Sequence, residues 1–275
     1  MQKRWSVFVA TILVVGSVFA FYERQRIAQA IYRVNSPAVP IAQPADAFVP
    51  VVETPPAVAT TTKSTAQKPK ATSTVPVVPA PKPVAAPDKI NLAVPFTTQA
   101  PFAVWEQPYE DGCEEASSAM VEWYYQNKQF SSHEVADAEL QRLFAWEVTT
   151  FGTNKDSSAA QTARMIREYY GRKKVVVKTN ITAADIRTEL AAGRPVIVPA
   201  YGKALKNPNF KNGGPVYHML VIKGYIRDTH FITNDSGTRN GADYTYTTQT
   251  LINALHDWND GDVPNGVPTM IVVYP

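Results

Sequence analysis

The chain contains a single cysteine, Cys113, which is the first candidate for covalent chemistry. One cysteine cannot form an intramolecular disulfide, and most lone cysteines are small buried hydrophobic side chains. The setting favours a second interpretation, because Asp111 can cap a helix and Glu114 completes a capping box with it. Cys113 then lies in the first helical turn, where backbone N–H groups and the helix dipole favour the reactive thiolate. The charges of Glu114 and Glu115 oppose the thiolate, so a nearby imidazolium is also required.

A histidine and an aspartate that could complete such a site occur in a predicted β-hairpin. With Arg227-Asp228 as the turn, His218 and Asp235 share one face and lie diagonally, with roughly 7 Å between their Cβ atoms. His230 falls on the opposite face. The carboxylate can then fix the ring tautomer and support the imidazolium that pairs with a thiolate. A turn with an odd number of residues would break this arrangement, because it shifts the register by one residue.

Two glutamines are candidates for the oxyanion hole: Gln99 in VPFTTQAPF, and Gln107, which precedes Cys113 closely. A side-chain amide and the Cys113 backbone N–H could together hold the oxyanion that develops during attack on a carbonyl. Spacing favours Gln107, because a short loop brings it back to the start of the helix. Interpretations that give these residues no catalytic role remain open. Either glutamine could be a surface residue, and His218 with Asp235 could be a hydrogen-bonded core histidine beside a turn aspartate.

The other histidines and the charge distribution predict no metal, cofactor or nucleic-acid site. His133 precedes a predicted helix, and His256 ends one, where the helix dipole favours a cation. One cysteine and four scattered histidines give no metal-ligand spacing. Residues 1–88 carry nine Lys and Arg against four Asp and Glu, whereas residues 89–275 carry eighteen against twenty. The basic surplus therefore lies outside the predicted domain, although nucleic-acid-binding domains usually carry a basic face.

Helical patterns come first and strand patterns later in residues 89–275, which predicts a single α+β domain. Hydrophobic spacing predicts four helices, at Glu114–Gln126, Ser132–Trp146, Ser158–Tyr170 and Ala183–Ala192. Five strands are predicted, at Lys174–Lys178, Pro195–Ala200, Tyr217–Gly224, His230–Asn234 and Thr269–Tyr274. The lysine-bearing run Gly202–Gly214 is predicted to be a solvated loop beside the cleft.

An apolar segment near the start of the chain predicts a membrane anchor. Residues 5–22 are 18 residues without a charge, long enough to cross a bilayer as a helix. Lys3 and Arg4, in the short tail 1–4, predict a cytoplasmic amino terminus and an extracytoplasmic domain. Cleavage after Ala20 by a signal peptidase is the alternative, and the domain is then secreted.

The region between the anchor and the domain has the composition of a spacer. Residues 23–35 are a predicted juxtamembrane segment. Residues 36–88 hold twelve of the 22 prolines, with Ala, Val and Thr around them. Such a sequence buries too little apolar surface to fold, so we expect a disordered linker. Residues 89–275 then form the folded domain.

Three separated motifs resemble a known family: VPFTTQAP, then CEEASSAMVEWYY, and later YHMLVIKGY with FITNDSGTRNG. Their order and wording over residues 91–275 are similar to bacterial cysteine peptidase-like domains related to the double-glycine (bacteriocin) leader peptidases. The resemblance implies a papain-like fold. It also implies Cys113 as nucleophile, His218 as general base and Asp235 as its orienting partner. The family's glutamine after a Val-Pro start matches Gln99, so the resemblance favours Gln99 over Gln107.

The chain also departs from that pattern. Leader peptidases usually have Cys-Gly in this motif, whereas this chain has Gly112-Cys113-Glu114. They are often fused to an ABC transporter and face the cytoplasm, whereas this domain is predicted to lie outside. The bond that is cleaved therefore stays open.

The leading hypothesis is a membrane-tethered peptidase or amide hydrolase that works through a thioester on Cys113. Its substrate would be a peptide or protein, with cell-wall peptide as a variant that suits a long tether, and its catalytic domain would be monomeric. A transglutaminase-like acyl transferase uses the same Cys-His-Asp order and is the second hypothesis. A catalytically inactive surface-binding module on the same fold is the third.

Overall fold

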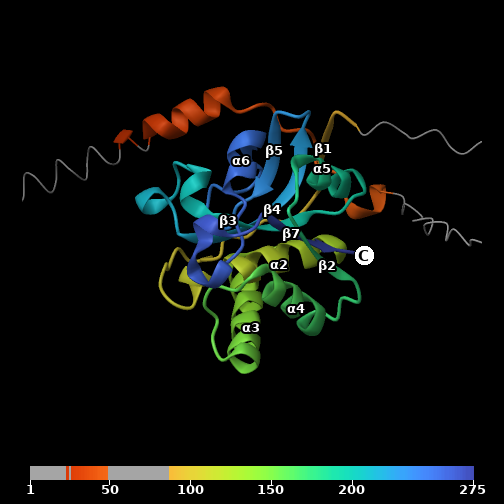
Figure 1. Ribbon diagram of the computed structural model, residues 1–275, viewed down its shortest axis with the longest axis vertical. Coiled ribbons are helices and arrows are strands. Elements are labelled where there is room, and N and C mark those ends of the chain that lie inside the picture. Colours follow the sequence, from red (N-terminus) through yellow and green to blue (C-terminus); the bar gives the residue numbers. More distant parts are fainter. Residues whose placement is uncertain (1–22, 25, 49–86) are drawn as a thin grey trace, which may run out of the picture.

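The computed structural model describes residues 23–24, 26–48 and 87–275 (Figure 1). Seven strands form one antiparallel sheet in the order β2-β7-β3-β4-β5-β6, and β1 pairs with β4. The strands are β1 (Lys89–Asn91), β2 (Val175–Thr179), β3 (Val196–Tyr201), β4 (Tyr217–Ile226), β5 (His230–Asn234), β6 (Tyr244–Thr247) and β7 (Thr269–Val273).

Helices cover both faces of this sheet (Figure 1). The helices are α2 (Cys113–Tyr125), α3 (His133–Phe151), α4 (Ala159–Tyr169), α5 (Ala183–Ala191) and α6 (Thr248–Ala254). Helix α2 packs on β3 and β4, α4 packs on β2 and β7, and α3 packs on α2 and α4. Helices α5 and α6 lie on the other side of the sheet (Figure 1). The structure is therefore α+β, as the sequence predicted.

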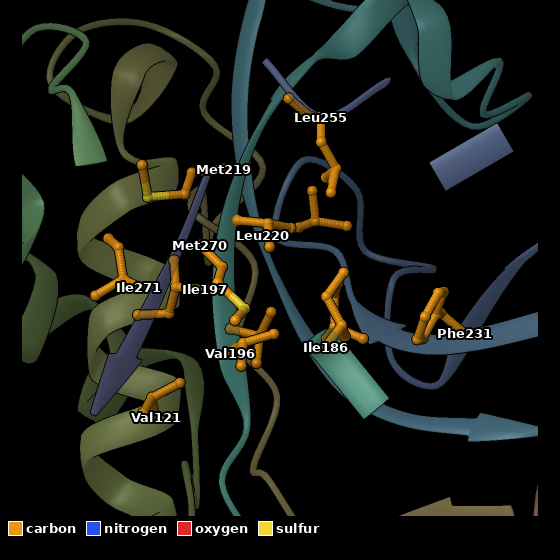
Figure 2. Packing of buried hydrophobic residues seen from close by; sticks show 14 of the residues in the cluster. Val121, Ile186, Val196, Ile197, Met219, Leu220, Phe231, Leu255, Met270 and Ile271 are labelled. Atoms are coloured by element: carbon orange, nitrogen blue, oxygen red, sulfur yellow. The ribbon is translucent and has the colours of Figure 1, made fainter. Parts of the chain in front are cut away.

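The alternation of side chains along β4 divides the core between these two layers. Met219 points toward α2, and Leu220 points to the other side of the sheet, toward Leu255 and Ile186 (Figure 2). All four side chains are almost completely buried. Because successive residues of a strand face opposite sides, a strand covered by helices on both faces is apolar without interruption. Strand β4 also carries His218, so this packing fixes the position of the histidine backbone.

The predicted elements agree with the structure to within a few residues, except for α3, which extends five residues further to Phe151. The sequence analysis did not predict β1 or β6, and it predicted α6 only as a helix that ends at His256, two residues beyond its end at Ala254. Strand β1 has only three residues. Strand β6 reads Tyr-Thr-Tyr-Thr, a period-two pattern that predicts a strand.

The predicted capping box at the start of α2 is wrong. The N-cap is Gly112 and not Asp111, because Tyr109–Asp111 form a 3-10 turn that runs directly into the helix. Glycine has no side chain, so this N-cap makes no side-chain hydrogen bond. The Asp111 carboxylate instead accepts a hydrogen bond from Gln107. A Cβ atom on Gly112 would lie 2.9 Å from the ring of Phe144. Glycine is therefore required at this position by the close packing of α3 against the start of α2.

The predicted hairpin turn is also wrong, but the predicted face of Asp235 is right. The turn between Ile226 and His230 has three residues, an odd number that alone would reverse the register. A β-bulge between Ile222 and Gly224 shifts the pairing back by one residue. The two irregularities cancel, and Asp235 emerges beyond the bulge on the side of His218.

Part of the predicted disordered linker, residues 36–88, lies on the folded domain in the structure. Residues 26–35 are helical, and the segment after them lies on the folded domain. Gln43 forms a parallel bridge with Leu92, its N–H donates to the carbonyl of Asn91, and its carbonyl accepts from the N–H of Ala93. These contacts continue the sheet edge at β1, so residues 36–48 belong to the domain. Residues 49–86 of the predicted linker lie outside the described residues.

The predicted tail at residues 1–4 and anchor at residues 5–22 also lie outside the described residues. Among the residues that the structure describes, none of the helices combines the length and the apolar character that a bilayer span requires.

Candidate active site

One cavity of about 1100 Å3 brings together the residues that the sequence predicted for chemistry. Its wall includes Cys113 and His218, with Gln99 beside them. The segment 98–105 forms one part of the wall, and residues from 209–218 form another. The cavity lies where the start of α2 meets the first residues of β4, so the two catalytic candidates come from elements more than 100 residues apart.

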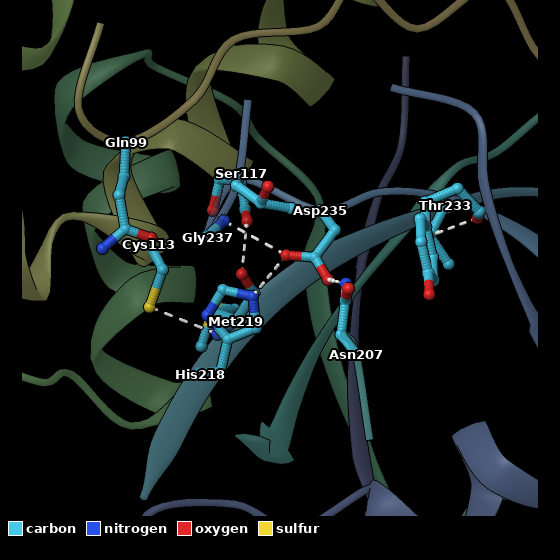
Figure 3. Close-up of polar contacts among 12 residues, drawn as sticks. Gln99, Cys113, Ser117, Asn207, His218, Met219, Thr233, Asp235 and Gly237 are labelled. Carbon is cyan, nitrogen blue, oxygen red and sulfur yellow. Dashed lines mark hydrogen bonds and ion pairs between the residues drawn. The ribbon is translucent and has the colours of Figure 1, made fainter. Parts of the chain in front are cut away.

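Cys113 is the first residue of α2 and is 3% exposed. Its Sγ accepts a hydrogen bond of 3.2 Å from the backbone N–H of Met219 on β4 (Figure 3). The thiol donates a second hydrogen bond, of 3.0 Å, to Oε2 of Glu114. Ser117, one turn further along α2, donates from its hydroxyl to the Met219 carbonyl. These contacts tie the helix that carries the sulfur to the strand that carries His218.

The surroundings of Cys113 favour the protonated thiol. Burial raises the pKa of the thiol well above its usual value, and the negative charges of Glu114 and Asp156 raise it further. The hydrogen bond that the thiol donates to Glu114 acts in the same direction. The sequence analysis expected the helix start to favour a thiolate. The structure shows instead that nearby carboxylates and burial outweigh it, so a proton acceptor beside the sulfur is required.

His218 and Asp235 form a buried pair, with 2.8 Å between Nε2 of the ring and Oδ1 of the carboxylate. Oδ1 also accepts from the N–H of Gly237, and Oδ2 accepts from the hydroxyl of Tyr246 and the amide of Asn207. Burial alone raises the pKa of Asp235, but the charge of His218 and these hydrogen bonds bring it below its usual value. The carboxylate is therefore held ionised.

The pairing through Nε2 leaves Nδ1 as the ring nitrogen that can act on Cys113. In the view of Figure 3 the His218 ring lies between Cys113 and Asp235. The edge of the ring is packed by Phe210, with 5.4 Å between the ring centroids. A Cβ atom on Gly237 would lie 2.9 Å from Cε1 of His218, so the loop approaches the ring closely because it has glycine there. These contacts leave the imidazole little freedom to turn.

The two glutamines occupy different environments. Gln99 lines the cavity and is buried, whereas Gln107 is exposed and donates to Asp111. The spacing argument that favoured Gln107 is therefore contradicted by its position. The Nε2 of Gln99 donates to the carbonyls of Tyr109 and Glu110, and its Oε1 is buried without a hydrogen-bond partner. In this geometry both N–H groups of Gln99 are engaged by the backbone.

The family of the chain follows from a comparison with known families. The model of the Peptidase_C39 like family matches residues 91–260, which is more than half of the chain. The chain belongs to this family. Its name agrees with the resemblance stated from the motifs, and the mixed helices and antiparallel sheet fit the papain-like fold that the resemblance implied. We refer to residues 89–275 as the C39-like domain.

Two further comparisons were made. Among solved structures, the chain is similar to a protein from Bacillus anthracis that is classed provisionally as a C39-like peptidase. The similarity covers 68% of this chain and 98% of that chain, with 17% sequence identity and a TM-score of 0.46. A search of curated proteins gave no significant match.

Four carboxyl groups on the α2 side of the C39-like domain have raised pKa values. Burial, followed by the charge of Asp156, raises the pKa of Glu114 to about 8. Burial and the charge of Asp111 raise the pKa of Asp156 to about 7, against the opposing charge of His218. Glu115 and Glu147 are close neighbours, and burial raises the pKa of both. At neutral pH Glu114 therefore carries a proton that an ordinary carboxylate has lost, and Asp156 carries one part of the time.

Several residues of the site were not predicted from the sequence. Asn207 and Tyr246, which donate to Asp235, lie in the loop before β4 and on β6. Asp156, which lines the cavity, lies in the loop before α4. The period-two pattern in β6 could have placed Tyr246 on one face of a strand. Asn207 carries no comparable signal, because loop residues follow no repeat.

The remaining histidines lie outside the pair with Asp235. His133 is the first residue of α3 and contributes to the cavity wall. His230 starts β5, and Nδ1 of His256, after α6, donates to the carbonyl of Gly266. Within the described ranges, no three His, Cys, Asp or Glu side chains are grouped so that they could hold a metal ion.

Proposed function

We propose that the chain is a cysteine peptidase or amide hydrolase in which Cys113 is the nucleophile, His218 the general base and Asp235 its orienting partner. One observation carries the proposal. The buried His218–Asp235 pair leaves Nδ1 to act in a cavity that Cys113 also lines, and the neighbouring N–H of Met219 already contacts the sulfur. The family supports a cysteine peptidase-like function at a coarser level.

The reaction begins with transfer of the thiol proton. The S–H of Cys113 turns from Glu114 toward Nδ1 of His218, which accepts the proton, and the negative charge of Asp235 stabilises the imidazolium. The thiolate attacks the substrate carbonyl carbon, and the carbonyl oxygen becomes an oxyanion. The imidazolium then protonates the departing amine, and a thioester remains on Cys113. A water molecule, deprotonated by His218, attacks the thioester and releases the acid.

The oxyanion lies near the start of α2 in this scheme. Gly112 provides no side-chain cap, so the N–H of Cys113 is one of the helix N–H groups without an intrahelical partner. It can donate to the oxyanion. Gln99 lies in the same wall of the cavity, and its amide would have to leave the carbonyls of Tyr109 and Glu110 to become the second donor. We propose it as the oxyanion partner that substrate binding recruits.

The setting proposed for the domain is the outer face of a membrane. Residues 5–22 would anchor the chain, and Lys3 and Arg4 favour a cytoplasmic amino terminus. The proline-rich residues 49–86 would act as a tether of on the order of 100 Å. Such reach, and an open cavity of about 1100 Å3, suit a peptide substrate, with cell-wall peptide as the substrate class to test first.

The test is peptide hydrolysis by the full-length chain. Ordinary peptides and cell-wall peptides are incubated with the wild type, with Cys113→Ala and with Ser118→Ala, and products are identified by mass spectrometry. Ser118 is a matched control, because it is buried in the same helix and its hydroxyl has no hydrogen-bond partner. We expect cleavage by wild type and Ser118→Ala only. Equal cleavage by Cys113→Ala would refute the proposal, and an amine that replaces water as acceptor would indicate acyl transfer.

A binding module is the second candidate, because the raised pKa of Cys113 is a property of an unreactive thiol. The rate of alkylation of Cys113 by iodoacetamide at neutral pH separates the two. An enzyme thiol assisted by His218 should react faster than free cysteine. A rate no faster than that of free cysteine supports the module.

A further inference from the structure

The helical residues 26–35 contact the C39-like domain through two polar side chains. Gln29 donates from Nε2 to Oδ1 of Asn209 at 3.0 Å. The Tyr32 hydroxyl lies 3.1 Å from Oγ1 of Thr245 and accepts from the Thr245 N–H at 2.7 Å. The apolar side chains of the same helix point away from the domain and are exposed: Ile27, Ile31 and Val34. Specific contacts, and not a buried apolar face, therefore define how this helix docks.

The contact of Gln29 leads to Asp235 through the loop before β4. Oδ1 of Asn207 accepts from both the N–H and the side-chain amide of Asn209, at 3.0 and 2.8 Å. The amide of Asn207 in turn donates to Oδ2 of Asp235 at 3.1 Å. Asn207 is 3% exposed, so water has little access to replace its amide as a donor to Asp235. Phe210, the residue after Asn209, packs against the ring of His218.

The contact of Tyr32 leads to the same carboxylate through β6. The Tyr32 ring stacks on Tyr244, with 4.2 Å between centroids and 1° between planes. Tyr244 packs against Tyr246 at 4.8 Å, and the Tyr246 hydroxyl donates to Oδ2 of Asp235 at 2.6 Å. The Tyr246 hydroxyl also accepts a hydrogen bond of 2.8 Å from the side-chain amide of Asn207. Both routes thus end on one oxygen of Asp235, the oxygen that His218 does not use.

We propose that Gln29 and Tyr32 are positioning residues for the His218–Asp235 pair, and that docking of residues 26–35 sets the reactivity of Cys113. The inference rests on the proposed function. A buried carboxylate stays ionised only while its donors are held in place. The docked helix holds the loop of Asn207 and the strand of Tyr246, which supply two of these donors. Gln29 and Tyr32 precede the residues 91–260 that match the family, so this chain adds them to the site from outside the matched region.

The consequence is regulation from the amino-terminal side. A change that lifts residues 26–35 off the domain would leave the nucleophile and the cavity intact. It would loosen Asp235, so that the imidazolium of His218 is less stabilised and the thiolate forms at higher pH. The helix directly follows the predicted anchor, so the state of the anchor would reach the active site through these two side chains.

The test measures the rate of Cys113 alkylation by iodoacetamide from pH 5 to pH 9 in the full-length chain. Cys113 is the sole cysteine, so the signal belongs to this residue. The double variant Gln29→Ala, Tyr32→Ala is compared with Val34→Ala, an exposed residue of the same helix. We expect the double variant to react about fivefold more slowly at pH 7, with its profile moved to higher pH, and Val34→Ala to match the wild type.

Two outcomes would overturn the inference. One is a double variant with the wild-type rate and profile. The other is a double variant whose melting temperature falls while its pH profile stays unchanged, which would assign the helix a structural role only. His218→Ala is measured in parallel. If it fails to slow alkylation, the proposed function itself fails. If it slows alkylation and the double variant does not, only the inference about Gln29 and Tyr32 fails.

Discussion

Carboxylates on the two sides of the cavity have opposite ionisation behaviour, although both sides are buried. On the sheet side, Asp235 is completely buried, yet its pKa lies below the usual value. On the helix side, Glu114 and Asp156 have pKa values raised to about 8 and about 7. The difference lies in their partners. Asp235 accepts from His218 and from three other donors, whereas Glu114 accepts from the Cys113 thiol and the Ser157 N–H and lies near the charge of Asp156.

The comparison shows how one fold can prepare a base and restrain a nucleophile. Hydrogen bonds to the charged form lower a carboxylate pKa, and burial without them raises it. The sheet side is therefore organised in the charged state that the proposed mechanism uses. The helix side holds protons and keeps Cys113 as a thiol until His218 can accept the proton.

Replacement of the ionised carboxylate has the largest expected effect. Asp235→Asn keeps the size of the side chain but removes the charge that supports the imidazolium, and kcat/KM should fall by about a thousandfold. Asp228→Asn, in the exposed hairpin turn, is the matched control and should leave kcat/KM unchanged. Steady-state hydrolysis of a peptide that the wild type cleaves measures both. A loss of less than about threefold in Asp235→Asn would contradict the assignment of Asp235.

The buried acids of the helix side predict that stability falls as pH rises. Unfolded Glu114 and Asp156 lose their protons near their ordinary pKa values, whereas the folded groups keep them to about 8 and about 7. The stabilisation is therefore present below about pH 4.5 and is lost as pH rises to 8. Urea unfolding at pH 5 and pH 8 measures it. Equal unfolding free energies at the two pH values would show that these acids are not protonated in the folded domain.

Removal of one donor to Asp235 should have a smaller effect. Tyr246→Phe keeps the ring and loses the hydroxyl that donates to Oδ2. One hydrogen bond to a charged group contributes about 1.5 kcal/mol or more, so kcat/KM should fall by roughly tenfold. Tyr225→Phe is a suitable comparison, because its hydroxyl donates to the carbonyl of Pro87, away from the cavity. Wild-type activity in Tyr246→Phe would mean that Asn207 and Gly237 hold the carboxylate without it.

Neutralisation of the helix side should have the smallest effect and the opposite sign. Glu114→Gln can keep the acceptor for the N–H of Ser157 and presents an amide donor to the sulfur. At pH 9, where the wild-type Glu114 is ionised, the substitution removes a negative charge beside the sulfur, so the thiolate is stabilised and alkylation by iodoacetamide should accelerate about threefold. Glu110→Gln, an exposed residue of the same cavity, should change the rate little. Slower alkylation in Glu114→Gln would make Glu114 a partner of the reaction and not a restraint on it.

The sequence predicted the helix of Cys113 and the hairpin of His218 because both depend on local periodicity. It also predicted the correct face for Asp235, although by a turn that the structure does not have. The three-residue turn and the bulge cancel, and neither irregularity is visible in an alternating pattern. The sequence analysis joined Cys113 and His218 in one site from the chemistry of the two side chains and from the resemblance to a family, and not from an arrangement of strands and helices.

The electrostatics of the site could not be predicted in the same way. The donors Asn207 and Tyr246 reach Asp235 from a loop and an edge strand, so their convergence is a tertiary property. The capping box at Asp111 failed because a 3-10 turn precedes the helix. Burial decided the pKa of Glu114, and burial depends on the packing of the whole domain. Resemblance placed Gln99 correctly in the cavity wall, where spacing had favoured Gln107.

Transfer of an acyl group to Cys113 tests the central claim most directly. The full-length chain is mixed with p-nitrophenyl acetate at pH 7, and the acetylated residue is identified by mass spectrometry over time in wild type and in His218→Ala. The account predicts rapid acetylation of Cys113 in the wild type, followed by release of acetate, with His218→Ala at least tenfold slower in forming the thioester. Acetylation of Cys113 at the same rate in both proteins would contradict it.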